Sequence, residues 1–286
     1  TVEATCTGYY SLDESDANFD GFLGDDYSGV SFPASPSDDP LLPTDLSVTV
    51  GLAASSNKLT VNGPNNSSIA VGEQYMRIFD NPNGGLDSSI SSDGILDLTA
   101  APEDTMEEVK TLINDDANWT CSRAGSDVDS KNLLKGLYST EASQEIFAVD
   151  SMAAITNLKT VSLKIANNNT SISGRATGDD SSVKWLLNNA ISRGKADVTL
   201  DLTMTAEDET FYDKYHAGTT IPLVRLDFGS HGSIALTNGT ITSFSRPLSP
   251  GVEIVDTMSI KFRGAGNYKN FSAYAISSSI SLNPSG

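Results

Sequence analysis

The stretch Asp197-Val198-Thr199-Leu200-Asp201-Leu202-Thr203-Met204 alternates strictly between polar and apolar side chains. Successive side chains of a β-strand point to opposite faces of a sheet, so this period of two predicts a strand with one polar and one buried face. The same alternation recurs in residues 160–165 and 46–52. Together these segments predict a fold built from half-buried strands, as in antiparallel sheets.

Weaker signals extend this pattern along the rest of the chain. Further strands are expected near residues 76–78, 96–98, 221–228, 233–237, 240–245, 252–262 and 274–282. Helices are expected from Thr105, over 133–138, over 181–193 and from Thr205 to Gly218, the first and last with capping boxes completed by Glu108 and Asp208. Many strands and a few short helices indicate a mainly β protein, an antiparallel β-sandwich or β-barrel.

The pattern is sharper after residue 150 than before it. We therefore divide the chain into residues 1–150, a β-rich region that is an extra domain, a large insertion or strands that complete the sandwich, and residues 151–286, a β-sandwich. Asp256 interrupts the apolar side of the expected strand 252–262. A charge at this position predicts a β-bulge or a contact between subunits.

The net charge excludes several classes of partner. Among 286 residues, 18 Lys and Arg stand against 37 Asp and Glu, a formal net charge of −19. Such a chain repels phosphate backbones and anionic membrane surfaces, so a general nucleic-acid binder is excluded and no membrane contact is expected. Hydrophobic residues make up 38 % and charged residues 19 %, a composition typical of a globular protein.

No catalytic motif stands out in the sequence. The chain has two histidines, His216 and His231, and the latter lies in a Gly-Ser-His-Gly segment typical of a hairpin turn. Cys6 and Cys121 predict two free thiols, although a disulfide between them stays open. We expect neither an enzyme nor a bound cofactor.

One acidic run resembles the start of a calcium loop. Asp16, Asn18 and Asp20 place oxygen ligands at alternate positions before Gly21. The position that would need a bidentate Glu is Tyr27. A solvated acidic turn is the preferred interpretation, and a metal site stays an alternative.

The order of segments after residue 155 carries a resemblance. The strand 161–165 and the alternating strand 197–204 precede the acidic and aromatic segment 206–220, which includes Phe211-Tyr-Asp-Lys-Tyr215-His-Ala-Gly218-Thr-Thr. Gly239-Thr-Ile-Thr-Ser-Phe-Ser245 and Pro250 to Gly264, with Phe262 near its end, follow. This order resembles the tail tube (major tail) proteins of long-tailed phages and related viruses, over about residues 155–265.

The resemblance implies a structural protein of the virion without catalytic activity. Subunits would form rings, commonly hexameric, which stack into a hollow tube that conducts DNA during genome ejection without binding it specifically. The implied partners are further copies of the chain and other tail proteins (terminator, tape measure, baseplate), and the implied location is the virion tail, assembled in the host cytoplasm. An acidic lumen would repel passing DNA.

The polar sides of strands 196–204 and 252–263 are the candidate lumen lining. Their residues are Asp197, Thr199, Asp201, Glu253, Thr257, Ser259 and Lys261. Two other classes of function stay open. The chain could be a capsid decoration or baseplate protein, or a calcium-binding surface or adhesion module.

Overall fold

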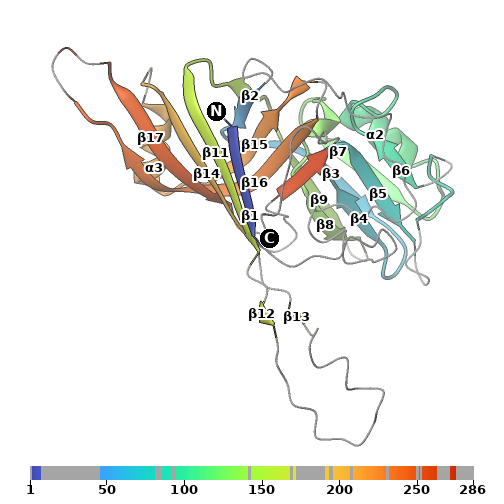
Figure 1. Ribbon diagram of the computed structural model, residues 1–286. Coiled ribbons are helices and arrows are strands. Elements are labelled where there is room, and N and C mark those ends of the chain that lie inside the picture. The colour runs from blue at the N-terminus through green and yellow to red at the C-terminus, as the bar shows by residue number, and fades with distance from the viewer. Residues whose placement is uncertain are drawn as a thin grey trace, which may run out of the picture.

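A computed structural model describes residues 2–7, 46–80, 86–91, 94–140, 143–167, 170–171, 191–192, 196–206, 209–229, 232–248, 251, 253–262 and 271–274. These residues form a mainly β protein, as the sequence predicts. Figure 1 shows two parts side by side, a large sheet that we call the sandwich and a smaller unit, residues 54–149, that we call the insert. A short two-stranded ladder, β12 (Thr170–Ser171) and β13 (Ile191–Ser192), projects from the sandwich (Figure 1).

The sandwich is one nine-stranded sheet with the order β1-β11-β14-β17-β16-β15-β2-β10 and with β18 paired to β16. Its strands are β1 (Val2–Thr7), β2 (Ser47–Gly51), β10 (Ala153–Ala154), β11 (Leu158–Asn167), β14 (Ala196–Thr205), β15 (Ile221–Asp227), β16 (Ser233–Ser245), β17 (Val255–Phe262) and β18 (Phe271–Tyr274). β1 pairs with β11 in parallel, and the other pairings are antiparallel.

Strand β16 joins two halves of this sheet. Its first half pairs with β15 and β18, whereas its second half pairs with β17. Apolar side chains from β2 and β15 belong to the same buried cluster as those from β11, β14 and β17. Because both halves contribute to one core, the sheet folds over on itself as a sandwich.

The insert has two small sheets around its own core. Its elements are β3 (Ala54–Asn62), β4 (Ser68–Val71), β5 (Tyr75–Phe79), β6 (Ile95–Asp97), α2 (Met106–Ile113), β7 (Thr120–Ala124), η2 (Ser130–Asn132), β8 (Gly136–Ser139) and β9 (Gln144–Val149). The sheets have the orders β7-β3-β9 and β6-β5-β4-β8. Trp119 is buried in this core, as an anchor residue should be, and its indole N–H donates to Asp87 over 2.8 Å.

Helix α2 begins as the sequence predicts. Thr105 accepts from the backbone N–H of Glu108, and the Glu108 carboxylate accepts from the backbone N–H of Thr105, which completes the capping box. Met106, Val109 and Ile113 are buried on one face. Helix α3 (Thr210–Ala217) instead begins at Glu209 without a side-chain cap and ends at Gly218 in the left-handed conformation.

Several expected elements differ from the structure. The helix expected over 133–138 is wrong, because η2 precedes this segment and β8 occupies its end. The capping box at Thr205 is wrong, since β14 continues through this residue. The strands expected at 233–237 and 240–245 are one strand, and the strand expected from 252 begins at Val255. Most of the helix expected over 181–193 lies outside the described residues, and its end is wrong, because Ile191–Ser192 form strand β13. Most of the strand 274–282 also lies outside the described residues.

The boundary near residue 150 stays a prediction. Strands β1 and β2 precede it in the sequence, yet both pair within the sandwich. The insert leaves the sheet after β2 and returns at β10, and Val50 and Ala153 are directly paired there. No helix in the described part of the chain is long and apolar enough to cross a membrane.

Candidate lumen face

The two central strands of the sandwich build a polar face. Val198, Leu200 and Leu202 of β14 are buried, and so are the even-numbered residues of β17. The odd-numbered residues therefore share the opposite face. Across the two strands, Thr199 pairs with Lys261, Asp201 with Ser259 and Thr203 with Thr257. Each of these side chains is exposed or half-buried.

The same face extends over two neighbouring strands. Ser162 and Lys164 of β11 pair with Asp201 and Thr199. On the other side, the register of β16 shifts between Ile241 and Ser243, which places an extra residue, Thr242, against β17. This bulge keeps Ile241 in the core and Ser243 on the polar face. Hydroxyl side chains therefore dominate a face four strands wide.

Six of the seven candidate lumen residues lie in these strands on the predicted polar side. They are Asp197, Thr199, Asp201, Thr257, Ser259 and Lys261. Glu253 lies before β17, where its carboxylate forms an ion pair with Lys159 and accepts a hydrogen bond from Thr205. The hydrogen bond from Lys159, assisted by Thr205, holds the pKa of Glu253 below its usual value. Which face lines a lumen stays a prediction.

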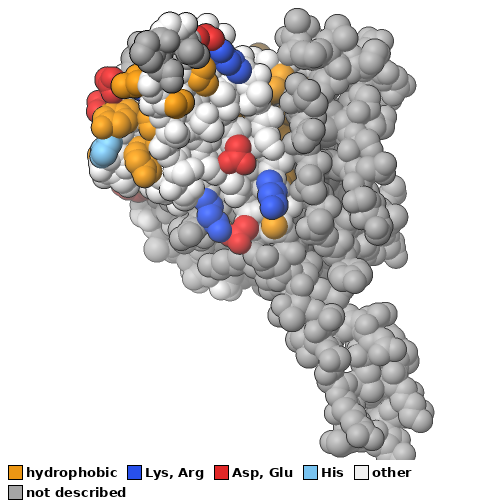
Figure 2. Space-filling model, turned by 60° about the vertical axis from the view of Figure 1, so that its left-hand side comes forward, with side chains coloured by type: hydrophobic (Ala, Val, Ile, Leu, Met, Phe, Trp, Pro, Cys, Tyr) orange, Lys and Arg blue, Asp and Glu red, His pale blue; other side chains and the backbone are white. Residues whose placement is uncertain are grey.

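The polar face is nearly neutral. Lys261 pairs with Asp197 at 2.8 Å, and the exposed residues Lys164 and Asp201 add one charge of each sign. Figure 2 shows the side of the molecule that carries β17 and α3, where the described surface is mostly white with single charged side chains. The net charge of −19 therefore arises from residues outside the polar face. Residues 1–149 contain 25 acidic and six basic residues (6 − 25 = −19), whereas residues 150–286 contain twelve of each.

The insert covers part of the opposite half of the sandwich. Leu223 and Ala235 pack with Leu134 and Val149 of the insert. Beside them, the buried carboxylate of Glu73 forms ion pairs with Arg225 and Lys135, the latter at 3.4 Å. The hydroxyl of Ser233 also donates to Glu73 over 3.1 Å. This buried group of charges joins the two parts of the molecule.

A second ion pair fixes the end of the sandwich where α3 lies. Asp256 is buried and accepts from Arg246 at 2.6 and 2.8 Å, while Glu209 pairs with the same guanidinium at 2.8 Å. The hydrogen bonds from Arg246 to Asp256 raise the pKa of Arg246. The bulge expected at Asp256 is therefore wrong for β17, whose register against β14 is continuous through this residue. The charge is compensated within the chain.

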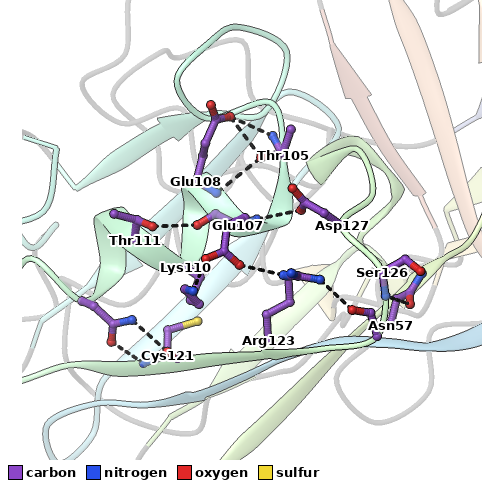
Figure 3. A network of polar contacts seen from close by, with 12 residues as sticks. Asn57, Thr105, Glu107, Glu108, Lys110, Thr111, Cys121, Arg123, Ser126 and Asp127 are labelled. Carbon is purple, nitrogen blue, oxygen red and sulfur yellow. Dashed lines mark hydrogen bonds and ion pairs between the residues drawn. The ribbon is translucent and has the colours of Figure 1, made fainter.

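The titratable groups of the insert are used structurally. The carboxylate of Glu107 binds Lys110 and Arg123 (Figure 3), and hydrogen bonds from these two side chains lower the pKa of Glu107. Burial raises the pKa of the Cys121 thiol to about 12, so this free thiol stays protonated at neutral pH.

The insert also has a shallow hollow on its surface. It is lined by Thr60, Asn62, Thr120, Cys121, Ser122 and Ser143. Among the described residues, no three His, Cys, Asp or Glu side chains cluster as metal ligands.

Several candidates lie outside the described residues or were missed. The acidic run Asp16, Asn18 and Asp20, together with His231, is outside them, and nothing is described of the side chain of Cys6. Sequence reasoning missed Ser162 and Lys164 as members of the polar face, although the alternation in residues 160–165 carried that signal. Sequence reasoning also considered only the net charge of the whole chain. The sequence itself shows that residues 1–149 carry all of this net charge and that residues 150–286 are neutral.

Comparisons with known proteins give partial similarities. No family model and no curated protein matches the sequence. A solved chain from the tail of an empty gene transfer agent particle, refined with C6 symmetry, is 15 % identical with a TM-score of 0.32. A chain from the virion of a native gene transfer agent particle is 13 % identical with a TM-score of 0.31. Each match covers 51 % of this chain and 99 % of the other.

Proposed function

We propose that this chain is a structural virion protein, a subunit of a viral tail tube. Copies form hexameric rings, and the rings stack around a lumen that conducts DNA during genome ejection. The subunit acts without a cofactor and without catalysis, in the virion tail, after assembly in the host cytoplasm. Its partners are further copies of itself and the terminator, tape measure and baseplate proteins. DNA passes through without specific binding.

The observation that carries this proposal is the polar face of β11, β14, β17 and the second half of β16. One side of these strands is committed to the core, whereas the other presents Thr and Ser hydroxyls with balanced charges. Strands that continue from subunit to subunit around a ring would close such a face into a wall and remove the open sheet edges. The sequence resemblance over residues 155–265 supports the same proposal.

The charge balance changes how the wall would work. An acidic lumen would repel DNA, but the face that we assign to the lumen carries Asp197 and Asp201 against Lys164 and Lys261. DNA binds basic surfaces because Lys and Arg side chains release counterions from its phosphates. This face has few basic side chains, so DNA would bind it only weakly. We assign its low adhesion to uncharged hydroxyls and paired charges, and we assign the acid surplus to the outside of the tube.

Electron microscopy of the concentrated full chain, and of virions that contain it, tests the proposal. We expect hollow tubes of stacked rings and immunogold labelling along the tail. A protein that stays monomeric at every concentration, or labelling confined to the capsid or the baseplate, would refute it. Thr199→Lys with Ser259→Lys tests the lumen face, because tubes with these added cations should retain duplex DNA in a salt-dependent way, whereas unaltered tubes should not.

A further inference from the structure

Exposed large apolar side chains gather at one end of the sandwich. The described residues contain five of them, namely Tyr212, Tyr215, Leu248, Ile254 and Leu137. Tyr212 and Tyr215 lie on α3, whereas Leu248, which is 74 % exposed, and Ile254 lie in the connection between β16 and β17. Figure 2 shows hydrophobic side chains gathered on this end. Contiguous exposed apolar surface of this kind marks interaction sites.

Ring contacts join Tyr212, Tyr215 and Phe244, and we call these rings, together with the exposed Leu248 and Ile254 of the β16–β17 connection, the α3 patch. The rings of Tyr212 and Tyr215 lie 5.7 and 6.0 Å from the ring of Phe244, centroid to centroid. Leu248 follows Arg246, whose guanidinium lies 5.9 Å from the Tyr212 ring. The carbonyl of Ile254 accepts from the backbone N–H of Ala206, just before α3, over 3.0 Å.

The α3 patch is held in place although its helix buries little. Helix α3 has eight residues and none is buried, and an isolated helix of this length is marginal in water. Arg246 fixes its beginning through Glu209 and its neighbouring strand through Asp256. Tyrosines held on a rigid element lose little side-chain freedom when they bind, which is why Tyr is common in the energetic centres of interfaces.

The charges around the α3 patch favour a second copy of this chain as its partner. At its rim, Glu209 and Asp256 share Arg246, and Glu253 pairs with Lys159, so these two cations are already paired with carboxylates of the same chain. Two copies that met through residues 1–149 would bring together the regions that hold the whole net charge of −19. Contact through the neutral half avoids this repulsion.

We propose that the α3 patch is the surface through which one copy binds the sandwich of the next copy, an inference that rests on the proposed self-assembly. The patch on one copy would meet a different surface on its neighbour. A contact of this heterologous kind generates rings or filaments, unlike a two-fold dimer contact. Tyr212 and Tyr215 form its centre, and the ion pairs of Arg246 and Lys159 form its rim.

Sedimentation and electron microscopy of the full chain with Tyr212→Ser and Tyr215→Ser test this inference. Loss of two central aromatic side chains should raise the concentration needed for assembly by about tenfold or more. Tyr212→Phe with Tyr215→Phe should assemble like the unaltered chain, because the apolar rings remain. The matched control is Leu137→Ser, which removes the exposed leucine of the insert and should leave assembly unchanged.

The outcomes separate this inference from the proposed function. If the unaltered chain and the serine variant assemble at the same concentration, the α3 patch faces another partner or solvent, and the inference is wrong while the tube proposal stands. If the unaltered chain never assembles, both are wrong. Circular dichroism must show that the variants are folded at the assembly temperature, because Tyr212 and Tyr215 also contact Phe244 within the single chain.

Discussion

Between residues 54 and 149 the insert carries fifteen acidic and six basic side chains, whereas residues 150–286, which supply most of the sandwich, carry twelve of each. The insert buries its apolar side chains in a closed core of its own. The sandwich, by contrast, leaves a hydroxyl-rich face and an aromatic patch exposed. The difference teaches that, within residues 54–286, the whole net negative charge lies in the insert, whereas the exposed aromatic side chains of the described residues lie on the sandwich.

The largest expected effect is at the junction of the two regions. Glu73→Ala would leave Arg225 and Lys135 buried without their carboxylate, and we expect a loss of about 3–5 kcal/mol in the free energy of unfolding. Urea unfolding should change from one transition to two as the insert and the sandwich uncouple. One transition at an unchanged midpoint would show that the ion group does not join them.

The matched control for this variant is Glu145→Ala. Glu145 pairs with Lys58 within the insert, and their side chains are 44 % and 29 % exposed. An exposed pair contributes at most about 1 kcal/mol, so this variant should keep a single transition.

The next effect concerns the sandwich alone. Asp256→Ala removes the buried partner of Arg246, and a hydrogen bond to a charged group contributes about 1.5–3 kcal/mol. We expect a loss of about 2–3 kcal/mol in urea unfolding followed by circular dichroism. Glu209→Ala, whose side chain is 64 % exposed, should cost less than about 1 kcal/mol. Equal losses in the two variants would contradict the assignment of Asp256 as the main partner.

A smaller effect is expected in the insert at helix α2. Thr105→Ala removes the side-chain oxygen that caps the helix and should cost about 1 kcal/mol in thermal unfolding. Thr111→Ala changes an exposed threonine later in the same helix and serves as the control. If both substitutions have the same effect, the capping box does not stabilise the insert.

The smallest effect is the dependence on pH. Burial alone would raise the pKa of Asp87, but hydrogen bonds from Ser89 and Trp119 outweigh it and hold the pKa below the ordinary 3.8. A lowered carboxylate pKa stabilises the fold above the ordinary value, and this contribution disappears as the pH falls through the lowered value.

Stability should therefore be level from neutral pH to about pH 5 and decline below about pH 4. Asp87→Asn should flatten this acid decline, measured by tryptophan fluorescence across the urea transition. A decline that is equally steep in the variant would assign the effect to other carboxylates.

The long alternating segments could be predicted from the sequence because one local rule decides them. In residues 197–204 every second side chain is apolar, and the strand has the expected faces. The failure at 133–138 has a local cause as well. Four residues of alternation at Gly136–Ser139 are too few to distinguish from a helical pattern, and the strand is decided by its pairing with β4.

The candidate site was predictable only in part. Strand alternation placed Thr199 and Ser259 on the polar side, but the width of that side depends on the order of strands in the sheet, which no local pattern contains. Asp256 shows the same limit. Its charge was visible in the sequence, whereas its partner Arg246 is brought to it by the β16–β17 pairing.

The place where the insert joins the sheet has a practical consequence. β2 and β10 are antiparallel neighbours, so the two ends of the insert leave the sandwich about 5 Å apart, the spacing of paired strands. A domain whose own termini lie this close together can be grafted at the same position without a long linker. If the chain polymerises, each subunit would then display one copy of the grafted cargo, and the sandwich would serve as a repeating scaffold for antigens or enzymes.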